Sequence, residues 1–237
     1  IGAIAGGGGL TKSGPSTVTL HLTNTYTGPT VVAGGVLAVN NLADGDNPSS
    51  LGASSSAAAN LVLDGGTLRL VGSQTSTNRA VTLGAGGGTI DLPPGNLTLQ
   101  ISGGLTGPGA LTKTGAGALI LAAANTHAGG TIVQSGTLVL ASDTANVSGL
   151  GPGGVTFTGG TLRMYYNDDI SSAATSSWPI HVPAGATGRL EADGRATLSG
   201  PLTGAGTLTF YTPFIRTDMA GNWSAFTGRL NIVSDAD

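Results

Sequence analysis

Apolar and polar residues alternate over short stretches of this chain, and glycines introduce most of these stretches. The recurring pattern is Gly-Gly-Thr, an apolar residue, any residue and a second apolar residue. Glycines permit a sharp bend, and the period of two that follows predicts a short β-strand with one buried face. The pattern, with single departures at Val36 and Ser135, occurs at residues 34–39, 65–70, 87–92, 135–140 and 159–164.

The rest of the chain adds similar short stretches and no sustained helical period. Residues 18–22, 81–83 and 97–101 alternate in the same way, and the alanine-rich run 54–59 is short and lies between strand signals. Short strands separated by Gly, Asn, Ser and Thr turns predict an all-β fold. With roughly 20 residues in each turn, we predict a parallel β-solenoid (β-helix) of about ten to twelve turns. Stacked at ~4.8 Å per turn, the rod would be on the order of 50 Å long.

The chain also repeats itself at a long period. Three marker residues return 101 positions later without a gap, Leu10 as Leu111, Asn24 as Asn125 and Leu37 as Leu138. A partial third copy begins at Gly204. Self-similarity at a fixed period indicates one structural unit stacked on itself. We therefore predict a single solenoid domain built of super-repeats at 1–106, 107–203 and, as a partial copy, 204–237.

Composition narrows the class of protein. Charged residues make up 9% of the chain, and glycine contributes 42 of its 237 residues. The apolar residues suit a thin core, whereas Thr, Ser and Asn suit an uncharged outer face on which like residues stack from turn to turn. The net charge of −3 includes no basic stripe, so we expect no nucleic-acid partner. We also expect no membrane-spanning helix, because no apolar run approaches 18 residues, and the absence of cysteine excludes disulfides and thiolate metal sites.

A set of motifs recurs at one fixed separation, namely Gly-x-Leu-Thr-Lys-x-Gly, Asn-x-Tyr-x-Gly-x-Thr-x-Val and Gly-x-Leu-x-Val. The set stands at 9–39 and 107–140, where His127 replaces the tyrosine, and in degenerate form at 204–232. This combination resembles the autotransporter-associated β-strand repeat. The resemblance implies a right-handed parallel β-helix that is secreted and displayed on a bacterial surface. Two parts of that family, a carboxy-terminal β-barrel translocator and a protease or lipase head, are not recognisable in this sequence.

The two ends of the chain raise the question of what covers them. The sequence begins in mid-repeat, so we expect a piece of a longer precursor. An uncovered solenoid end exposes strand edges and an open core. We predict end-to-end stacking, with other copies of the chain or with further repeats of a longer precursor. The residues at this interface, some of which would otherwise form a cap on the last turn, are Ile1, Ile4, Phe210, Tyr211, Phe214, Trp223 and Phe226.

One stretch departs from the repeat and is the candidate ligand loop. Two tyrosines and two aspartates in a loop can stack on a sugar or hold a calcium ion through oxygen atoms. The simpler interpretation is a loop whose rings cover the side of the solenoid. The residues are Tyr165, Tyr166, Asp168 and Asp169, with Trp178 nearby in the sequence.

One charged cluster is the candidate for catalysis, because β-helix polysaccharide lyases place carboxylates beside Arg or Lys on adjacent turns. Opposite charges that alternate along a strand are more often a solvated face. The cluster contains Arg189, Glu191, Asp193 and Arg195. We expect the three histidines to point outward from different turns without forming a metal site.

These observations support three hypotheses. The leading one is a non-enzymatic, extracellular structural solenoid that serves as a stalk, fibre or filament module in adhesion or cell-surface architecture. It predicts no catalytic residue, no cofactor and no metal ion. The second is a carbohydrate-binding adhesin that recognises cell-surface glycans through the Tyr165–Asp169 loop. The third is a polysaccharide lyase or hydrolase that works through Glu191.

Overall fold

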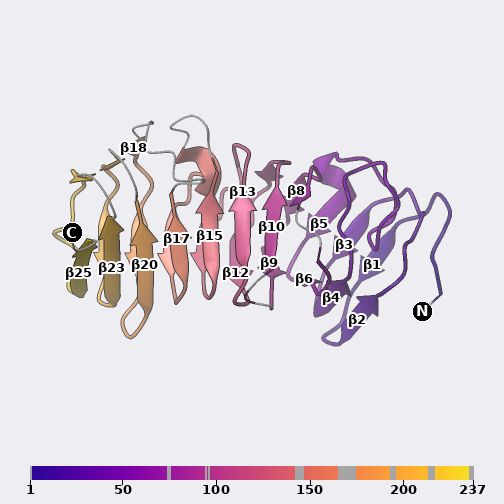
Figure 1. The fold of residues 1–237 in the computed structure, drawn as a ribbon, viewed down its shortest axis with the longest axis horizontal. Helices are drawn as coiled ribbons and strands as arrows, with labels where there is room; N and C mark the ends of the chain where they lie inside the picture. The colour runs from indigo at the N-terminus through magenta and orange to yellow at the C-terminus, as the bar shows by residue number, and fades with distance from the viewer. Residues whose placement is uncertain are drawn as a thin grey trace.

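The strands of successive turns lie side by side and build a rod (Figure 1). The computed structural model describes residues 2–73, 76–93, 95, 97–141, 147–164, 175–192, 196–212 and 217–234. Within that part, helical structure is limited to two 3₁₀ turns, Ala58–Asn60 and Val147–Leu150. The predicted all-β parallel solenoid is confirmed, with about nine turns, close to the ten to twelve that the sequence predicted.

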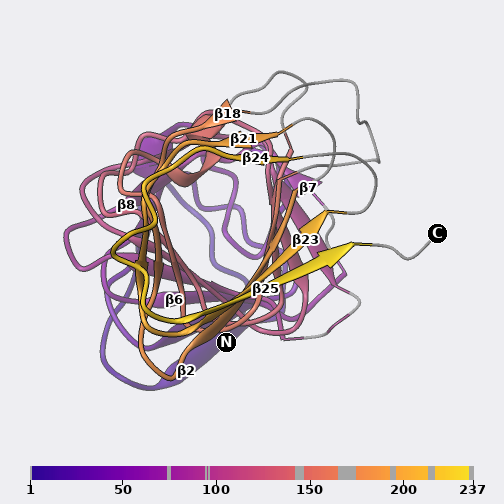
Figure 2. The same ribbon diagram turned by 90° about the vertical axis from the view of Figure 1, so that its left-hand side faces the viewer.

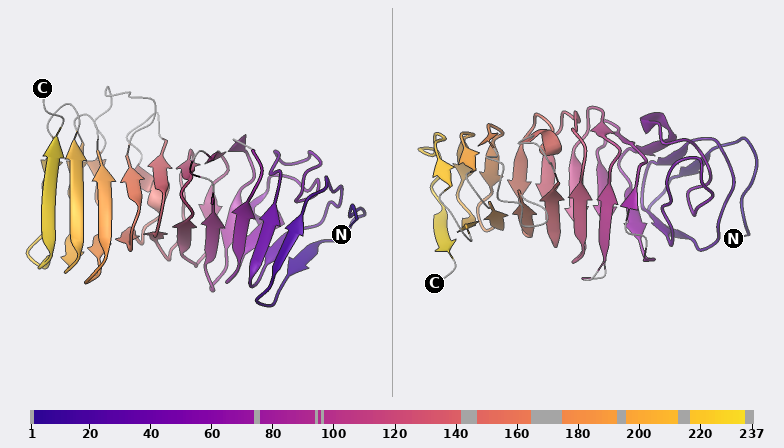
Figure 3. Two further views of the ribbon diagram at one scale, coloured as in Figure 1. Left: turned by 60° about the horizontal axis from the view of Figure 1, so that its bottom comes forward. Right: turned by 45° about the horizontal axis from the view of Figure 1, so that its top comes forward.

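Three long sheets enclose the core, as the end-on view in Figure 2 and the side views in Figure 3 show. The first face has five strands, β1 (Leu10–Lys12), β3 (Thr30–Val32), β5 (Leu61–Leu63), β8 (Val81–Leu83) and β11 (Leu105–Thr106). The second face has nine, β2 (Thr17–Leu20), β4 (Val36–Val39), β6 (Thr67–Leu70), β9 (Gly88–Asp91), β12 (Leu111–Thr114), β14 (Thr131–Val133), β16 (Val155–Phe157), β19 (Ile180–Val182) and β22 (Leu202–Gly204).

The third face has eight strands, β7 (Ser76–Thr77), β10 (Thr98–Ile101), β13 (Ala118–Leu121), β15 (Thr137–Leu140), β17 (Thr161–Arg163), β20 (Thr187–Glu191), β23 (Thr207–Thr212) and β25 (Arg229–Ser234). A short sheet of three strands, β18 (Thr175–Ser176), β21 (Thr197–Leu198) and β24 (Asp218–Met219), lies in the C-terminal turns. The chain therefore passes from face to face at corners rather than by crossover helices.

In-register pairing stacks like residues above one another. One inward column of the second face runs through Leu37, Leu68 and Ile90, each of which is almost fully buried. The neighbouring outward column holds threonine at six of nine turns, namely Thr17, Thr67, Thr89, Thr112, Thr156 and Thr203. The structure thus has the thin apolar core and the stacked hydroxyl face that the composition predicted.

Glycines allow the corners to pack closely from turn to turn. Gly107 and Gly204 hold equivalent positions in two super-repeats and have φ angles of +101° and +103°. A Cβ atom at either residue would approach a carbonyl oxygen of the preceding turn to 2.2 Å (Leu83) or 2.1 Å (Val182). Both the conformation and the lack of space exclude a side chain, so glycine is required at this corner.

The long repeat does not correspond to a whole number of turns. β1 and β3 of the first copy lie on the first face, whereas their counterparts 101 positions later, β12 and β14, lie on the second. In the same way β2 moves from the second face to β13 on the third. Four turns separate β1 from β11 on the first face, and β12 follows on the next face. Each super-repeat therefore contains four turns plus one face, and successive copies are rotated around the rod.

Distances between spin labels will test this rotation, because the chain has no cysteine of its own. Thr17 and Thr112 share a ladder of the second face four strands apart, so cysteines there should lie at backbone positions ~19 Å apart. Thr11→Cys with Thr112→Cys, the pair equivalent by repeat, joins two faces and should give a longer distance by double electron–electron resonance. Copies stacked in register would make the second pair the shorter one.

Candidate functional site

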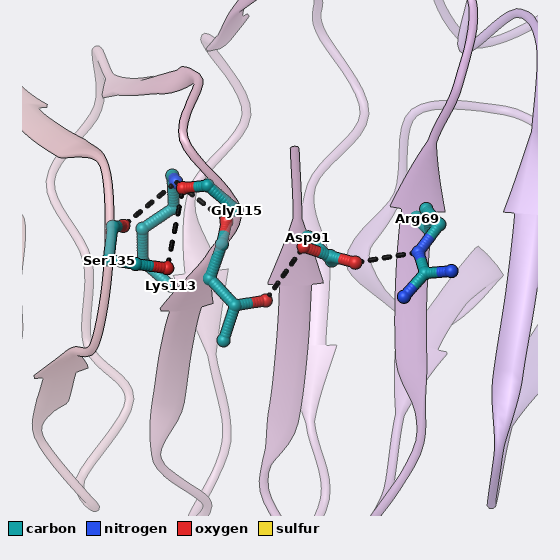
Figure 4. Close-up of polar contacts among 6 residues, drawn as sticks. Arg69, Asp91, Lys113, Gly115 and Ser135 are labelled. Atoms are coloured by element: carbon teal, nitrogen blue, oxygen red, sulfur yellow. Dashed lines mark hydrogen bonds and ion pairs between the residues drawn. The ribbon is translucent and has the colours of Figure 1, made fainter. Parts of the chain in front are cut away.

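The lysine of the repeat motif closes a corner of the solenoid. The Lys113 Nζ donates to the carbonyl oxygens of Thr114 (2.7 Å), Gly115 (2.9 Å) and Ser135 (3.3 Å), as Figure 4 shows. Lys12 makes the same three contacts in the first copy, at 2.8 to 2.9 Å. Burial lowers the pKa of Lys113 to about 8, although Asp91 opposes the change, so the ammonium remains the main form at neutral pH.

The asparagine of the motif joins three successive turns. Asn125 accepts from the Leu105 backbone N–H through Oδ1 (2.7 Å) and donates through Nδ2 to the Gly149 carbonyl (2.7 Å). Asn24 makes the equivalent bonds to Ile4 N–H and the Ser50 carbonyl, at 2.8 Å each. Both side chains are buried, and each uses its acceptor and its donor on opposite sides. The motif asparagine is therefore a bridge inside the fold and not a surface ligand group.

The motif aromatic position is also internal. The Tyr26 hydroxyl hydrogen-bonds Thr30 Oγ1 at 2.7 Å, and His127 Nε2 hydrogen-bonds Thr131 Oγ1 at 3.1 Å in the second copy. His127 has no exposed surface, so the expectation that all three histidines point outward was wrong for this one. The reason is that His127 takes the buried place of a repeat tyrosine. The other two histidines, His21 and His181, are exposed.

Burial lowers the pKa of His127, and the nearby backbone groups of Gly130 and Leu105 offset only part of this effect. Among the described residues, the Nδ1 atom of His127 has no hydrogen-bond partner. A second proton on this ring would therefore be buried without a well-formed hydrogen bond to the described residues, which disfavours the charged form.

A buried arginine that the motifs gave no reason to expect holds the longest turn together. Arg79 is 2% exposed and donates to carbonyl oxygens of the loop between β4 and η1. The shorter contacts run from Nε to Ala43 (2.9 Å) and from Nη1 and Nη2 to Ser54 (3.0 Å) and Gly52 (3.1 Å). Its planar guanidinium directs donors at several carbonyls that lie apart from one another, whereas the donors of a lysine all lie on one nitrogen atom. The one signal in the sequence that could have indicated this role is that Arg79 lies outside every alternating stretch.

An ion pair links two strands of the second face. The Nε of Arg69 donates to Asp91 Oδ2 at 2.6 Å, and the Thr114 hydroxyl donates to Asp91 Oδ1 at 3.0 Å (Figure 4). The three side chains come from β6, β9 and β12, so they connect three consecutive turns. The Arg69 side chain is 37% exposed, and an ion pair this close to solvent contributes little to stability.

The predicted catalytic cluster is a second, larger ion pair on the third face. Glu191 accepts from Arg163 Nε (2.7 Å) and Arg189 Nε (2.6 Å) with its two carboxylate oxygens. Burial raises the pKa of Glu191, but the hydrogen bonds from Arg189 and Arg163 outweigh it and the net pKa is lowered. The carboxylate therefore stays ionised, which makes it a poor proton donor. Asp193 and Arg195 of the predicted cluster lie outside the described residues.

The other predicted site residues are placed as follows. The ligand loop, Tyr165, Tyr166, Asp168 and Asp169, lies outside the described residues, as do Ile1 and Phe214 of the predicted interface. Trp178 and Phe210 belong to the core. Ile4, Trp223 and Phe226 are partly buried against that core. No group of three metal-binding side chains occurs among the described residues. None of the helices described is long and apolar enough to cross a membrane.

The repeat itself is known from other proteins. The family model of the passenger-associated-transport-repeat matches residues 10–39 and 111–140. Two segments of the chain are thus similar to the passenger-associated-transport-repeat. These are the two copies whose lysine, asparagine and aromatic residues occupy the internal sites described above, so the resemblance drawn from the sequence is confirmed.

A curated relative extends this likeness. The "Adhesin BmaC autotransporter" of Brucella suis is 50% identical over 128 residues, which is 54% of this chain. The matched stretch is 4% of the length of that adhesin. No solved structure matches the chain significantly. The passenger-repeat relationship therefore rests on sequence, and the solenoid geometry comes from this structure alone.

The burial of His127 leads us to predict that the protein loses stability in acid. Its folded-state pKa is lowered, so its contribution is fully present above the ordinary pKa of about 6.5 and is lost as the pH falls through the folded-state pKa. His127→Tyr restores the pairing seen at Tyr26 and removes the titrating group. Urea unfolding between pH 7.5 and about 5 should show a smaller decrease in the variant than in the parent. The exposed His181→Gln is the control, and equal decreases in all three proteins would contradict the assignment.

Proposed function

We propose that this chain is a non-enzymatic structural segment of a bacterial surface adhesin, exported as part of a passenger and displayed outside the cell. The observation that carries the proposal is its 50% identity, over 128 residues, to an autotransporter adhesin. The structure supports a stalk role because the motif side chains Lys12, Lys113, Asn24 and Asn125 are used inside the fold. The repeated residues therefore serve to build the rod.

The rotation of the repeats supports display in more than one direction. Outward positions of the first copy face one side of the rod, and their counterparts in the second copy face the next side. A stalk with this geometry offers equivalent surfaces around its axis as it lengthens. This arrangement suits attachment to a cell or a matrix whose orientation is not fixed, in which several weak contacts act together.

The enzyme hypothesis has less support. A lyase or hydrolase acting through Glu191 needs a carboxyl group that can exchange a proton, whereas two arginines hold this carboxylate ionised. The cluster of Glu191 with its two arginines is better suited to binding a ligand than to catalysing a reaction.

We further propose that another turn covers the C-terminal end of the solenoid. Ile232 continues the inward column below Phe210, yet it is 60% exposed, and Met219, in register with the buried Leu198, is exposed as well. A strand with apolar residues in register would bury them, whether it comes from a second copy or from further repeats of a longer precursor. Trp223 and Phe226, which lie beside this turn, would border the junction.

Adhesion can be measured directly. Microspheres coated with the purified chain should attach to cultured animal cells several-fold more than microspheres coated with albumin. Soluble chain should compete for the attachment, because the same surface is then occupied. Attachment no higher than on the albumin control, with the chain shown to be folded by circular dichroism, would contradict the adhesive role.

Sedimentation analysis distinguishes stacking of separate copies from continuation by further repeats at the C-terminal end of the solenoid. If copies stack on one another, the average mass should rise with concentration, and Ile232→Asp should abolish the rise by placing a charge in the junction. Leu22, which is 49% exposed away from the last turn, provides the control as Leu22→Asp. A monomer at all concentrations would exclude self-stacking and leave the continuation by further repeats, which a longer fragment that buries Ile232 would demonstrate.

A further inference from the structure

Basic side chains gather on one part of the third face. Seven Lys and Arg residues lie in the described part of the chain, and three of them are buried. Three of the other four lie on this face: Arg163 on β17, Arg189 on β20 and Arg229 on β25. Glu191 is the only carboxylate on β17, β20, β23 and β25. These strands thus carry a positive charge although the whole chain has a net charge of −3.

Strand register places these charges on the same side of the sheet. Arg163 pairs with Glu191, and Arg189 stands two residues before Glu191, so the three side chains point the same way. Asn231 lies two strands from Arg189 in the same ladder and accepts a hydrogen bond from Arg229 Nε at 2.9 Å. From β17 to β25 the surface extends ~14 Å across the strands.

Arg189 is held in a fixed orientation. Its Nε donates to Glu191 Oε1 at 2.6 Å, and its guanidinium carbon lies 4.4 Å from the centre of the Tyr211 ring. The side chain remains 35% exposed. Within the described residues, Arg189 is held through its Nε and through the face of the Tyr211 ring, and neither contact uses its two Nη groups. A guanidinium held this way presents a preorganised pair of donors that matches a carboxylate.

We propose that this surface, the arginine surface formed by Arg163, Arg189, Tyr211 and Arg229, binds the carboxylate groups of an acidic sugar chain. A linear polyuronate fits better than a single small anion, because the arginines are spread across several strands and repeated carboxylates can meet them in turn. The inference names a ligand class for the adhesive role proposed above and rests on that role.

Binding of defined sugar chains tests the proposal. Immobilised wild-type chain should retain oligogalacturonate, which carries carboxylates, and should not retain neutral dextran. Arg189→Gln should weaken binding at least about tenfold, since a charge-assisted hydrogen bond is lost. Arg189→Lys keeps the charge but loses the paired donors, so it should weaken binding as well.

Two further variants control for folding and for general charge. Arg229 is exposed and bonds only to Asn231 in the described structure, so Arg229→Gln should leave the melting temperature unchanged while weakening binding. Arg69 makes the same Nε–carboxylate contact at 2.6 Å on the second face. Arg69→Gln removes one positive charge elsewhere on the rod and should leave binding unchanged.

The outcomes divide clearly. Selective retention that Arg189→Gln and Arg229→Gln weaken, and Arg69→Gln does not, supports the proposal. No retention of oligogalacturonate overturns it, as does equal retention of sulphated dextran with equal losses in all three glutamine variants, which indicates unspecific attraction of polyanions. If the wild-type chain attaches to cells but retains no oligogalacturonate, the ligand inference fails and the adhesive role stands. If cell attachment is also absent in the wild-type chain, the adhesive role itself fails.

Discussion

Hydrogen bonding at the corners is the constraint on which this solenoid depends. Along the faces, parallel strands satisfy one another's backbone groups, but at each bend the chain leaves the ladder and its carbonyls turn away from regular partners. Lys12 and Lys113 provide three donors each at such a corner, and Asn24 and Asn125 bridge to the turns on either side. A buried carbonyl without a donor costs about 1 to 3 kcal/mol. These few polar side chains therefore allow a chain that is rich in glycine and poor in charge to turn sharply and still stack.

The same residues explain why the motif is so well preserved within the chain while the faces vary. The motif side chains bond to backbone groups at a bend of the chain. The motif can therefore stabilise a corner beside any face. The second copy can thus be rotated by one face relative to the first while its lysine keeps the same three contacts. The third copy shows the limit of this rule. Phe210 stands where Lys113 stands in the second copy, and the position is filled by an aromatic ring in the core instead of an ammonium at the corner.

The fold could be predicted from the sequence because the signals for it are local. Gly-Gly-Thr with alternating apolar residues sets both the bend and the strand at 65–70 and 87–92, and the strands β6 and β9 form there. The number of residues per turn could not be predicted, since it depends on loops such as the one that Arg79 holds. For that reason the rotation of one copy relative to the next could not be predicted from the sequence. The burial of His127 was missed although Tyr26 already marked that position as aromatic and conserved in role between the copies.

The use of basic side chains inside the fold also determines where positive charge remains on the surface. Burial of Lys12, Arg79 and Lys113 removes much of the positive charge from the surface. The arginines that remain can then dominate a small area, although the chain as a whole is acidic. Asp91 pairs with one guanidinium, that of Arg69, whereas Glu191 is shared between Arg163 and Arg189, so that two guanidiniums meet one carboxylate on β17 and β20. Both sites use the same contact between an arginine Nε and a carboxylate, and only the second brings two arginines to one carboxylate. A difference in recognition between two faces can thus arise from one additional arginine on a scaffold that is otherwise repeated.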